Sequence, residues 1–137
     1  YKYLHELIEL NGMKDQIKLL GFHENPYKFM RHADIYCSAS SLEGFSVVMS
    51  EAIILGKPVV AINSCGTDEL LEMGEYGILV ENSDEDLYNA LSKIINDKEV
   101  FKYYQEKSKL RQSFFNRNRL IDEMMKYLES FLNTENS

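Results

Sequence analysis

The stretch that decides the fold is SLEGFSVVMSEAIILGKPVVA, residues 41–61. Its pattern predicts a loop, then a helix over residues 47–55, and then a short buried strand over residues 58–62. Gly56 is typical of a helix end, and Pro58 cannot continue the helix. The predicted helix is apolar on almost every side, which indicates that it is buried.

One carboxylate interrupts this apolar helix. Glu51 lies inside it, and Glu43 lies eight positions earlier, in the loop. We expect Ser46 to be the N-cap residue, and Met49 at the third position after it excludes a capping box. An ionised carboxylate in a buried helix is costly unless it is partnered. Glu51 must therefore reach the surface or meet hydrogen-bond donors, either from the protein or from the hydroxyls of a ligand.

Short apolar segments alternate with amphipathic helical segments on both sides of this stretch. The expected strands cover residues 17–22, 34–40, 58–62 and 76–80. The expected helices cover residues 3–10, 26–33, 47–55, 68–73 and 84–96. Asn25 and Pro26 would begin the second helix, a turn over residues 65–68 would precede the fourth, and Ser83 would cap the fifth. This alternation predicts an α/β fold, with a small parallel sheet of about four strands flanked by helices.

The pattern from residue 98 onward is entirely helical. Two amphipathic helices are expected, over residues 99–114 and 117–132, and they meet near Asn116. We therefore divide the chain into a sheet-containing part, residues 1–97, and C-terminal helices of the same domain, residues 98–137.

Composition narrows the class of protein. The chain has 137 residues and a net charge of −7, which argues against nucleic acid as a partner because that binding is dominated by neutralisation of the phosphate backbone. A local anion site built from backbone groups stays open. Cys37 and Cys65 form no CxxC pair, and we interpret them as free thiols in a reducing, cytoplasmic compartment. No apolar run approaches the length of a membrane helix. The chain opens in helical pattern without Met, so we expect a piece of a longer protein.

The loop before the central helix has the features of an anion site. Gly44 allows a ligand to approach the backbone closely, and the first N–H groups of a helix have no partner within it. Together with the helix dipole they favour phosphate, at the edge of a parallel sheet where ligands bind. Carboxylates accept hydrogen bonds from vicinal hydroxyls. Glu43 and Glu51 therefore indicate a sugar-nucleotide site, with one acid for a sugar and the other for a ribose.

The run EGFSVVMSEAIILGKPVVA, residues 43–61, resembles the E-x7-E motif of retaining GT-B glycosyltransferases of the family 4 type. Residues 17–22 and 27–46 are similar to the segment before this motif, which ends in A-D and E-G-F. Residues 65–91 are similar to the G-x-x-E and G-x-L-V segment after it. The order and spacing match over about residues 17–96, which is more specific than a lone glycine-rich loop.

The resemblance implies a Rossmann-like, donor-binding C-terminal domain, part of which residues 1–97 would form. Glu43 would be the catalytic-site acid that binds the donor sugar, and Glu51 would bind the ribose. Donor sugar and diphosphate would lie against Gly44 and the backbone N–H groups of Phe45, Ser46 and Val47. The nucleobase would be bordered by Gly21, Phe22 and His23. The reaction would transfer a hexose-type sugar from a UDP- or GDP-sugar with retention, with no metal and no other cofactor.

Two departures from the family pattern stand out. Cys65 takes the place of the first of two glycines in a G-G-x-x-E loop, so that Gly66 and Glu69 remain. The Arg and Lys that neutralise the diphosphate in the family, and the acceptor-binding N-terminal domain, fall outside this sequence. A leaving diphosphate without cations is poorly stabilised, so we expect this chain alone to be inactive.

Two other functions remain open at this point. One is a nucleotide-sugar epimerase of GT-B architecture, and the other is a non-catalytic sugar-nucleotide-binding module. For the transferase, the expected partners are a nucleotide-sugar and a saccharide or lipid-linked acceptor, in cell-surface polysaccharide or glycolipid synthesis. The basic segment over residues 107–119 leaves peripheral contact with the inner face of a membrane open. Apolar surface on the terminal helices would allow the chain to dimerise.

Overall fold

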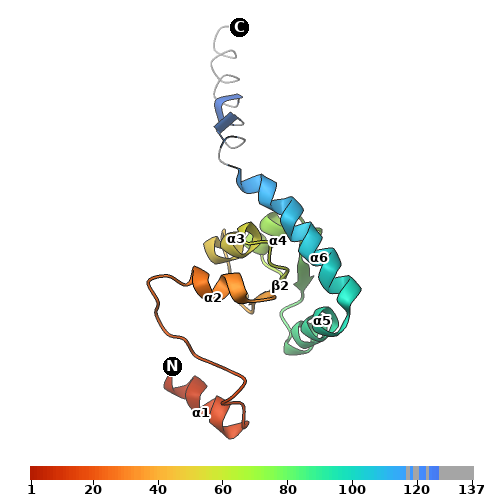
Figure 1. The fold of residues 1–137 in the computed structure, drawn as a ribbon. Helices are drawn as coiled ribbons and strands as arrows, with labels where there is room; N and C mark the ends of the chain where they lie inside the picture. Colours follow the sequence, from red (N-terminus) through yellow and green to blue (C-terminus); the bar gives the residue numbers. More distant parts are fainter. Residues whose placement is uncertain (117, 119–120, 123, 127–137) are drawn as a thin grey trace.

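The computed structural model describes residues 1–116, 118, 121–122 and 124–126. Its centre is a parallel sheet of three strands in the order β1-β2-β3 (Figure 1). The strands are β1 (Tyr36–Ser38), β2 (Val59–Ile62) and β3 (Ile78–Val80). In register, Tyr36 lies opposite Val59, and Val60 lies opposite Ile78. The predicted α/β fold with a parallel sheet flanked by helices is confirmed, with three strands rather than four.

The central strand is buried on both faces, as its continuous apolar run predicts. Its Val59 and Ala61 pack against α3 (Val47–Ile54) and α4 (Cys65–Leu71) on one face. Its Val60 packs on the other face against α5 (Asp84–Asn96), with α6 (Lys98–Arg111) beside it. The two halves of the core therefore meet through one strand.

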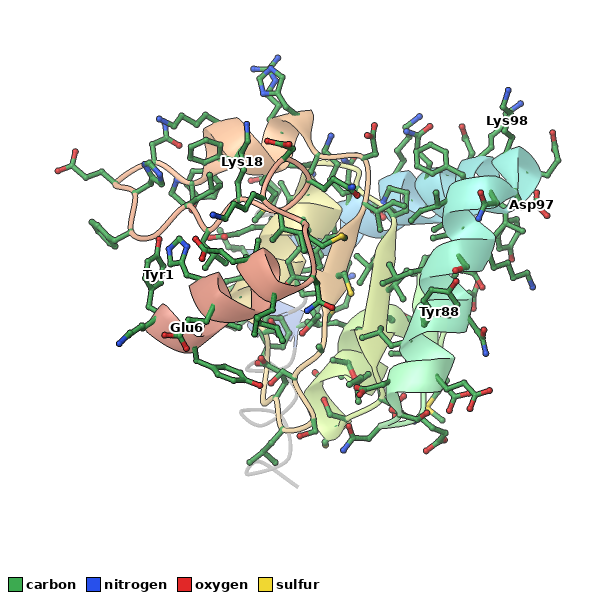
Figure 2. All side chains as sticks on the ribbon, turned by 90° about the horizontal axis from the view of Figure 1, so that it is seen from below. Tyr1, Glu6, Lys18, Tyr88, Asp97 and Lys98 are labelled. Atoms are coloured by element: carbon green, nitrogen blue, oxygen red, sulfur yellow. The ribbon has the colours of Figure 1, made fainter. Side chains whose placement is uncertain are left out.

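The helix ends follow from local sequence. Ser46 is the N-cap of α3, and its Oγ accepts a hydrogen bond from the Met49 N–H at 3.4 Å. Gly56 follows the helix with a φ of +68°, which glycine adopts without strain. Ser83 Oγ accepts from the Asp86 N–H at the start of α5. Asp97 separates α5 from α6 and caps the latter, and Figure 2 shows Asp97 and Lys98 at this junction.

Residues 17–22 are not a strand, which corrects one prediction. The segment has strand-like composition, but a strand needs a neighbour to satisfy its backbone groups. It lies in the connection between α1 (Lys2–Leu10) and α2 (Tyr27–His32), away from the sheet (Figure 1). The Leu19 carbonyl instead accepts a hydrogen bond from the Tyr1 hydroxyl at 2.9 Å.

Two helix starts also differ from expectation. α2 begins one residue late, with Pro26 rather than Asn25 at the N-cap position. α4 includes the residues predicted as a turn, because Ser64 caps it and the Thr67 hydroxyl accepts from the Ser64 N–H at 2.7 Å. Thr67 is fully buried, so this capping box is part of the core.

The C-terminal part agrees with prediction as far as the structure describes it. α6 continues into a 3₁₀ turn, η1 (Gln112–Phe115), and Asn116 has an extended backbone where two helices were expected to meet. Gln112 Nε2 donates to the Ile54 carbonyl at 2.8 Å and so attaches this end of α6 to α3. The second expected helix, over residues 117–132, lies largely outside the described residues.

Candidate functional site

The parallel strands end at one edge of the sheet, and there the loop after β1 meets the start of α4, which follows β2. The Gly66 N–H, in the first turn of α4, donates to the Glu43 carbonyl at 3.3 Å. The contact is close, because a Cβ atom on Gly66 would lie 1.5 Å from the Gly44 carbonyl oxygen. Gly66 therefore packs directly against the loop that carries Glu43 and Gly44. This close packing is a structural reason for glycine at position 66.

The side of Gly44 on which a side chain would lie is open. A Cβ atom built on Gly44 would have no neighbour within 4 Å, and its φ is not in the left-handed region. Nothing in the described fold therefore requires glycine at this position. Space for a ligand remains a reason for it.

The start of α3 carries free backbone donors. Ser46 satisfies the Met49 N–H, whereas the N–H groups of Val47 and Val48 meet no acceptor among the described residues. Ser46 is buried, and the side chains of Phe45, Val47 and Val48 are exposed. α3 is thus open to solvent at its first turn, which corrects the prediction that it is buried on nearly every side.

Tyr36 connects the sheet to this loop. Partial burial is the main cause that raises the pKa of its phenol, a hydrogen bond with Ser46 opposes this rise, and the nearby charge of Glu43 adds to it. Glu43 lies three positions before the N-cap of α3 and is only partly exposed.

Glu51 meets a donor from another helix. The Tyr27 hydroxyl, in the first turn of α2, donates to Glu51 Oε1 at 2.8 Å. Glu51 raises the pKa of Tyr27 through this hydrogen bond and through its charge. The acid in the apolar helix is thus both partly exposed and partnered, which answers why the helix tolerates it.

The predicted base-bordering residues lie beside the same helix α2. The ring of His23 lies against that of Phe29, with centroids 4.7 Å apart. Gly21 has a φ of +68°, and the next residue, Phe22, is 91% exposed. Tyr27 and Phe29 both belong to α2, so this helix contacts Glu51 through one residue and His23 through the other.

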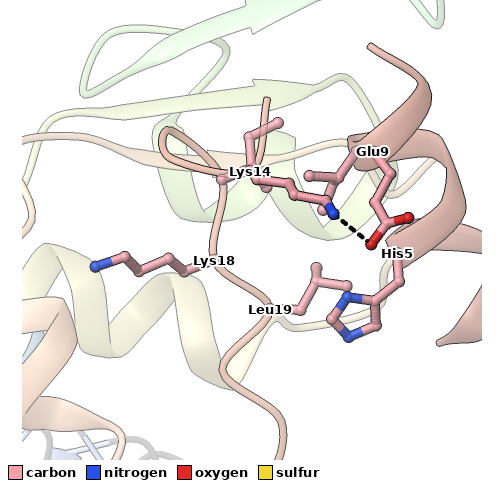
Figure 3. Close-up of a pocket in the computed structure, with 7 residues that line it drawn as sticks. His5, Glu9, Lys14, Lys18 and Leu19 are labelled. Atoms are coloured by element: carbon pink, nitrogen blue, oxygen red, sulfur yellow. Dashed lines mark ion pairs between the residues drawn. The ribbon is translucent and has the colours of Figure 1, made fainter. Parts of the chain in front are cut away.

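The described part of the chain has a pocket away from this site. This pocket, of about 340 Å³, lies between α1 and the connection after it, and its lining includes His5, Lys14 and Lys18 (Figure 3). Glu9 in the same pocket pairs with Lys14 at 2.8 Å, which lowers the pKa of Glu9. This pocket shares no residue with the predicted site.

The described residues offer neither a metal site nor a membrane span. No group of three or more His, Cys, Asp and Glu side chains there is arranged to hold a metal ion. No helix within the same residues has the length and apolar character to cross a membrane.

The sequence does not predict the contacts that Tyr27 and Gly66 make in this site. The partner of Tyr27 lies 24 positions away in the sequence, so no local pattern could identify the contact. Gly66 was identified only through the resemblance, and its closeness to Gly44 depends on how α4 packs against the loop after β1.

The comparisons with known proteins agree with the fold. The family described as glycosyl transferases group 1 matches residues 1–111. The Campylobacter jejuni protein N-acetylgalactosamine-N,N'-diacetylbacillosaminyl-diphospho-undecaprenol 4-alpha-N-acetylgalactosaminyltransferase is 34% identical over 124 residues, which are 89% of this chain and 34% of that protein.

Solved structures give the same result. Anabaena Alr3699/HepE in complex with UDP matches with a TM-score of 0.82 and 28% identity, over 94% of this chain and 36% of that one. The same protein in complex with UDP-glucose matches with a TM-score of 0.73 and 26% identity. This chain thus spans about a third of the length of the Campylobacter and Anabaena proteins. From the family match, the sequence identity and the shared architecture, the chain belongs to the group 1 glycosyl transferases, of the GT-B type.

Proposed function

We propose that this chain is part of the donor-binding half of a retaining glycosyltransferase of the family 4 type. The observation that carries the proposal is the open start of α3, where free N–H groups follow Glu43 and Glu51 lies further along the same helix. The complete protein would transfer a sugar from a nucleotide-sugar to an acceptor, without a metal cofactor. The chain alone would bind donor without turnover.

Each residue has a role in this proposal. The N–H groups of Phe45, Ser46 and Val47 donate hydrogen bonds to the sugar or diphosphate, because a helix start attracts anions. Gly44 leaves room for that group, as its open surroundings allow. Glu43 accepts hydrogen bonds from the donor sugar.

The nucleoside part of the donor would lie along α2. Glu51, on the neighbouring helix α3, accepts hydrogen bonds from the ribose hydroxyls. Gly21, Phe22 and His23 border the base. Phe22 is exposed and free to contact it, whereas His23 is held against Phe29.

The relatives narrow the proposed substrates. The Anabaena protein was solved with UDP and with UDP-glucose, which favours a UDP-sugar as donor here. The name of the Campylobacter protein includes a diphospho-undecaprenol-linked saccharide. We therefore place the reaction in cell-surface polysaccharide or glycolipid synthesis, at the inner face of a membrane, with a lipid-linked acceptor bound by another part of the protein.

Binding of nucleotides tests the proposal. An NMR titration of the ¹⁵N-labelled chain with UDP, GDP and ADP should shift the amides of residues 43–51 with one of them, UDP first. Glu51→Ala should abolish these shifts. Glu106→Ala, a change of an exposed carboxylate on α6, should leave them unchanged.

The complete gene product provides the decisive form of the experiment. There Glu51→Ala should weaken UDP binding by at least about tenfold, since hydrogen bonds to a charged group are lost. A product with the donor's anomeric configuration, read by NMR, would support retention. UDP affinity that is the same in the wild type and in Glu51→Ala would contradict the proposed site.

A further inference from the structure

We propose that Tyr27 is a positioning residue of the donor site. Tyr27 fixes the carboxylate of Glu51 in the orientation in which it accepts hydrogen bonds from the hydroxyls of a ribose. The inference rests on the proposed function, because it assigns a ribose to Glu51. It adds a residue that lies outside the E-x7-E motif and on a different helix.

The contact between the two residues is direct. The Tyr27 hydroxyl donates to Glu51 Oε1 at 2.8 Å, and no other hydrogen bond or ion pair of the Glu51 carboxylate is found among the described residues. Tyr27 is 47% exposed, so its ring faces solvent on one side. The hydroxyl is therefore not buried by packing, and its hydrogen-bond partner is the acid of the proposed site.

The helix that carries Tyr27 is fixed relative to α3 at a second point. Lys57, just after α3, donates from Nζ to the carbonyl of Arg31 at the end of α2, at 2.7 Å. α2 is thus attached to the α3 region near both of its ends. Tyr27 therefore has a defined position from which to hold Glu51.

The geometry leaves the carboxylate able to bind a diol. A carboxylate has about four acceptor positions, and the phenol uses one of them, on Oε1. Oε2 and the rest of Oε1 remain for two vicinal hydroxyls. Because Glu51 raises the pKa of Tyr27, the phenol stays protonated and continues to donate at neutral pH.

The benefit to binding is preorganisation. A free glutamate samples several rotamers and loses this freedom when it binds a ligand. The Tyr27 hydrogen bond restricts Glu51 before the ligand arrives, and a hydrogen bond to an ionised acceptor is strong enough to do so. Loss of the hydroxyl should weaken ribose binding without removing the acceptor itself.

The test uses Tyr27→Phe in the complete gene product, with UDP and 2′,3′-dideoxyuridine diphosphate as probes in calorimetry. UDP should bind about fivefold more weakly to the variant, the loss expected for one hydrogen bond. The dideoxy nucleotide, which has no ribose hydroxyls, should bind equally to variant and wild type. Tyr88→Phe, at an exposed position on α5, serves as the matched control and should change neither affinity.

A double-variant cycle isolates the coupling with Glu51. In a Glu51→Ala background, Tyr27→Phe should cause no further loss of UDP affinity. An equal loss for both nucleotides, a further loss in the Glu51→Ala background, or an unchanged UDP affinity in Tyr27→Phe would each overturn the inference. If Glu51→Ala itself left UDP binding intact, the proposed function would fail instead, so the two failures are distinguishable.

Discussion

Gly44 and Gly66 lie against each other where the loop after β1 meets the first turn of α4, and they differ in the space around them. A methyl group on Gly66 would occupy the place of the Gly44 carbonyl, whereas one on Gly44 would meet open space. Neither glycine has a φ in the left-handed region, so the space alone separates the two substitutions.

The first prediction compares the alanine variants of these two glycines. Gly66→Ala should lower the free energy of unfolding by about 3 kcal/mol or more, because backbone must move to accept the new atom. Gly44→Ala should change it by less than about 1 kcal/mol. Urea unfolding of both variants measures the difference. Equal stabilities of the two variants would contradict the close packing of Gly66 against Gly44.

At the residue scale, the sequence predicts which groups need partners but not which groups supply them. The apolar pattern around Glu51 indicates that its carboxylate requires a donor. The donor is Tyr27, on a helix that reaches Glu51 only through the folding of the chain. The same limit applies to Gly66, whose pattern gives no hint that Gly44 lies against it.

At the element scale, prediction succeeds where local signals agree. β2 is a continuous apolar run rich in β-branched residues, and α5 has a serine cap and an amphipathic pattern, so both appear where expected. The strand predicted over residues 17–22 does not form, because a strand depends on a neighbouring strand that local composition does not provide. The start of α4 was misplaced because the side chain of Thr67, rather than Glu or Gln, completes its capping box.

Arg111 joins α6 to the C-terminal end of α4. It is 6% exposed, its Nε donates to the Leu70 carbonyl at 3.0 Å, and its guanidinium also contacts the Glu69 carbonyl and the Glu72 carboxylate. The carbonyls at a helix end lack partners within the helix, so Arg111 serves as a cap supplied by another element. It therefore holds α4, and with it Gly66, in place.

The second prediction tests this connection. Arg111→Leu should lower the free energy of unfolding by about 2–4 kcal/mol, because buried carbonyls lose their donors. Lys109→Leu on the same helix should change it by less than about 0.5 kcal/mol, since its ion pair with Glu106 is exposed. Denaturant unfolding of the two variants distinguishes a buried cap from a general loss of positive charge. Similar effects in both would contradict the role given to Arg111.

At the scale of the whole molecule, the packing is uneven. The sheet and α3 to α6 share the two core clusters, whereas no residue of α1 is buried. α1 lies at one side of the molecule, and α5 lies at the other, as the positions of Glu6 and Tyr88 show (Figure 2). The apolar face of α1 includes Leu4, Leu7 and Leu10, all of them exposed. Amphipathic pattern alone could not predict this, because the pattern predicts an apolar face but not what covers it.

The same leucine-to-alanine change should therefore have very different effects in the two regions. Leu70→Ala, at a fully buried position in α4, should lower the free energy of unfolding by about 2–5 kcal/mol through lost contacts and a cavity. Leu7→Ala, at a position that is 43% exposed, should lower it by less than about 1 kcal/mol. In native-state hydrogen exchange, the amides of α1 should exchange by local opening while those of β2 need global unfolding. A large loss of stability in Leu7→Ala, or equal protection of α1 and β2, would mean that α1 belongs to the same cooperative unit as the sheet.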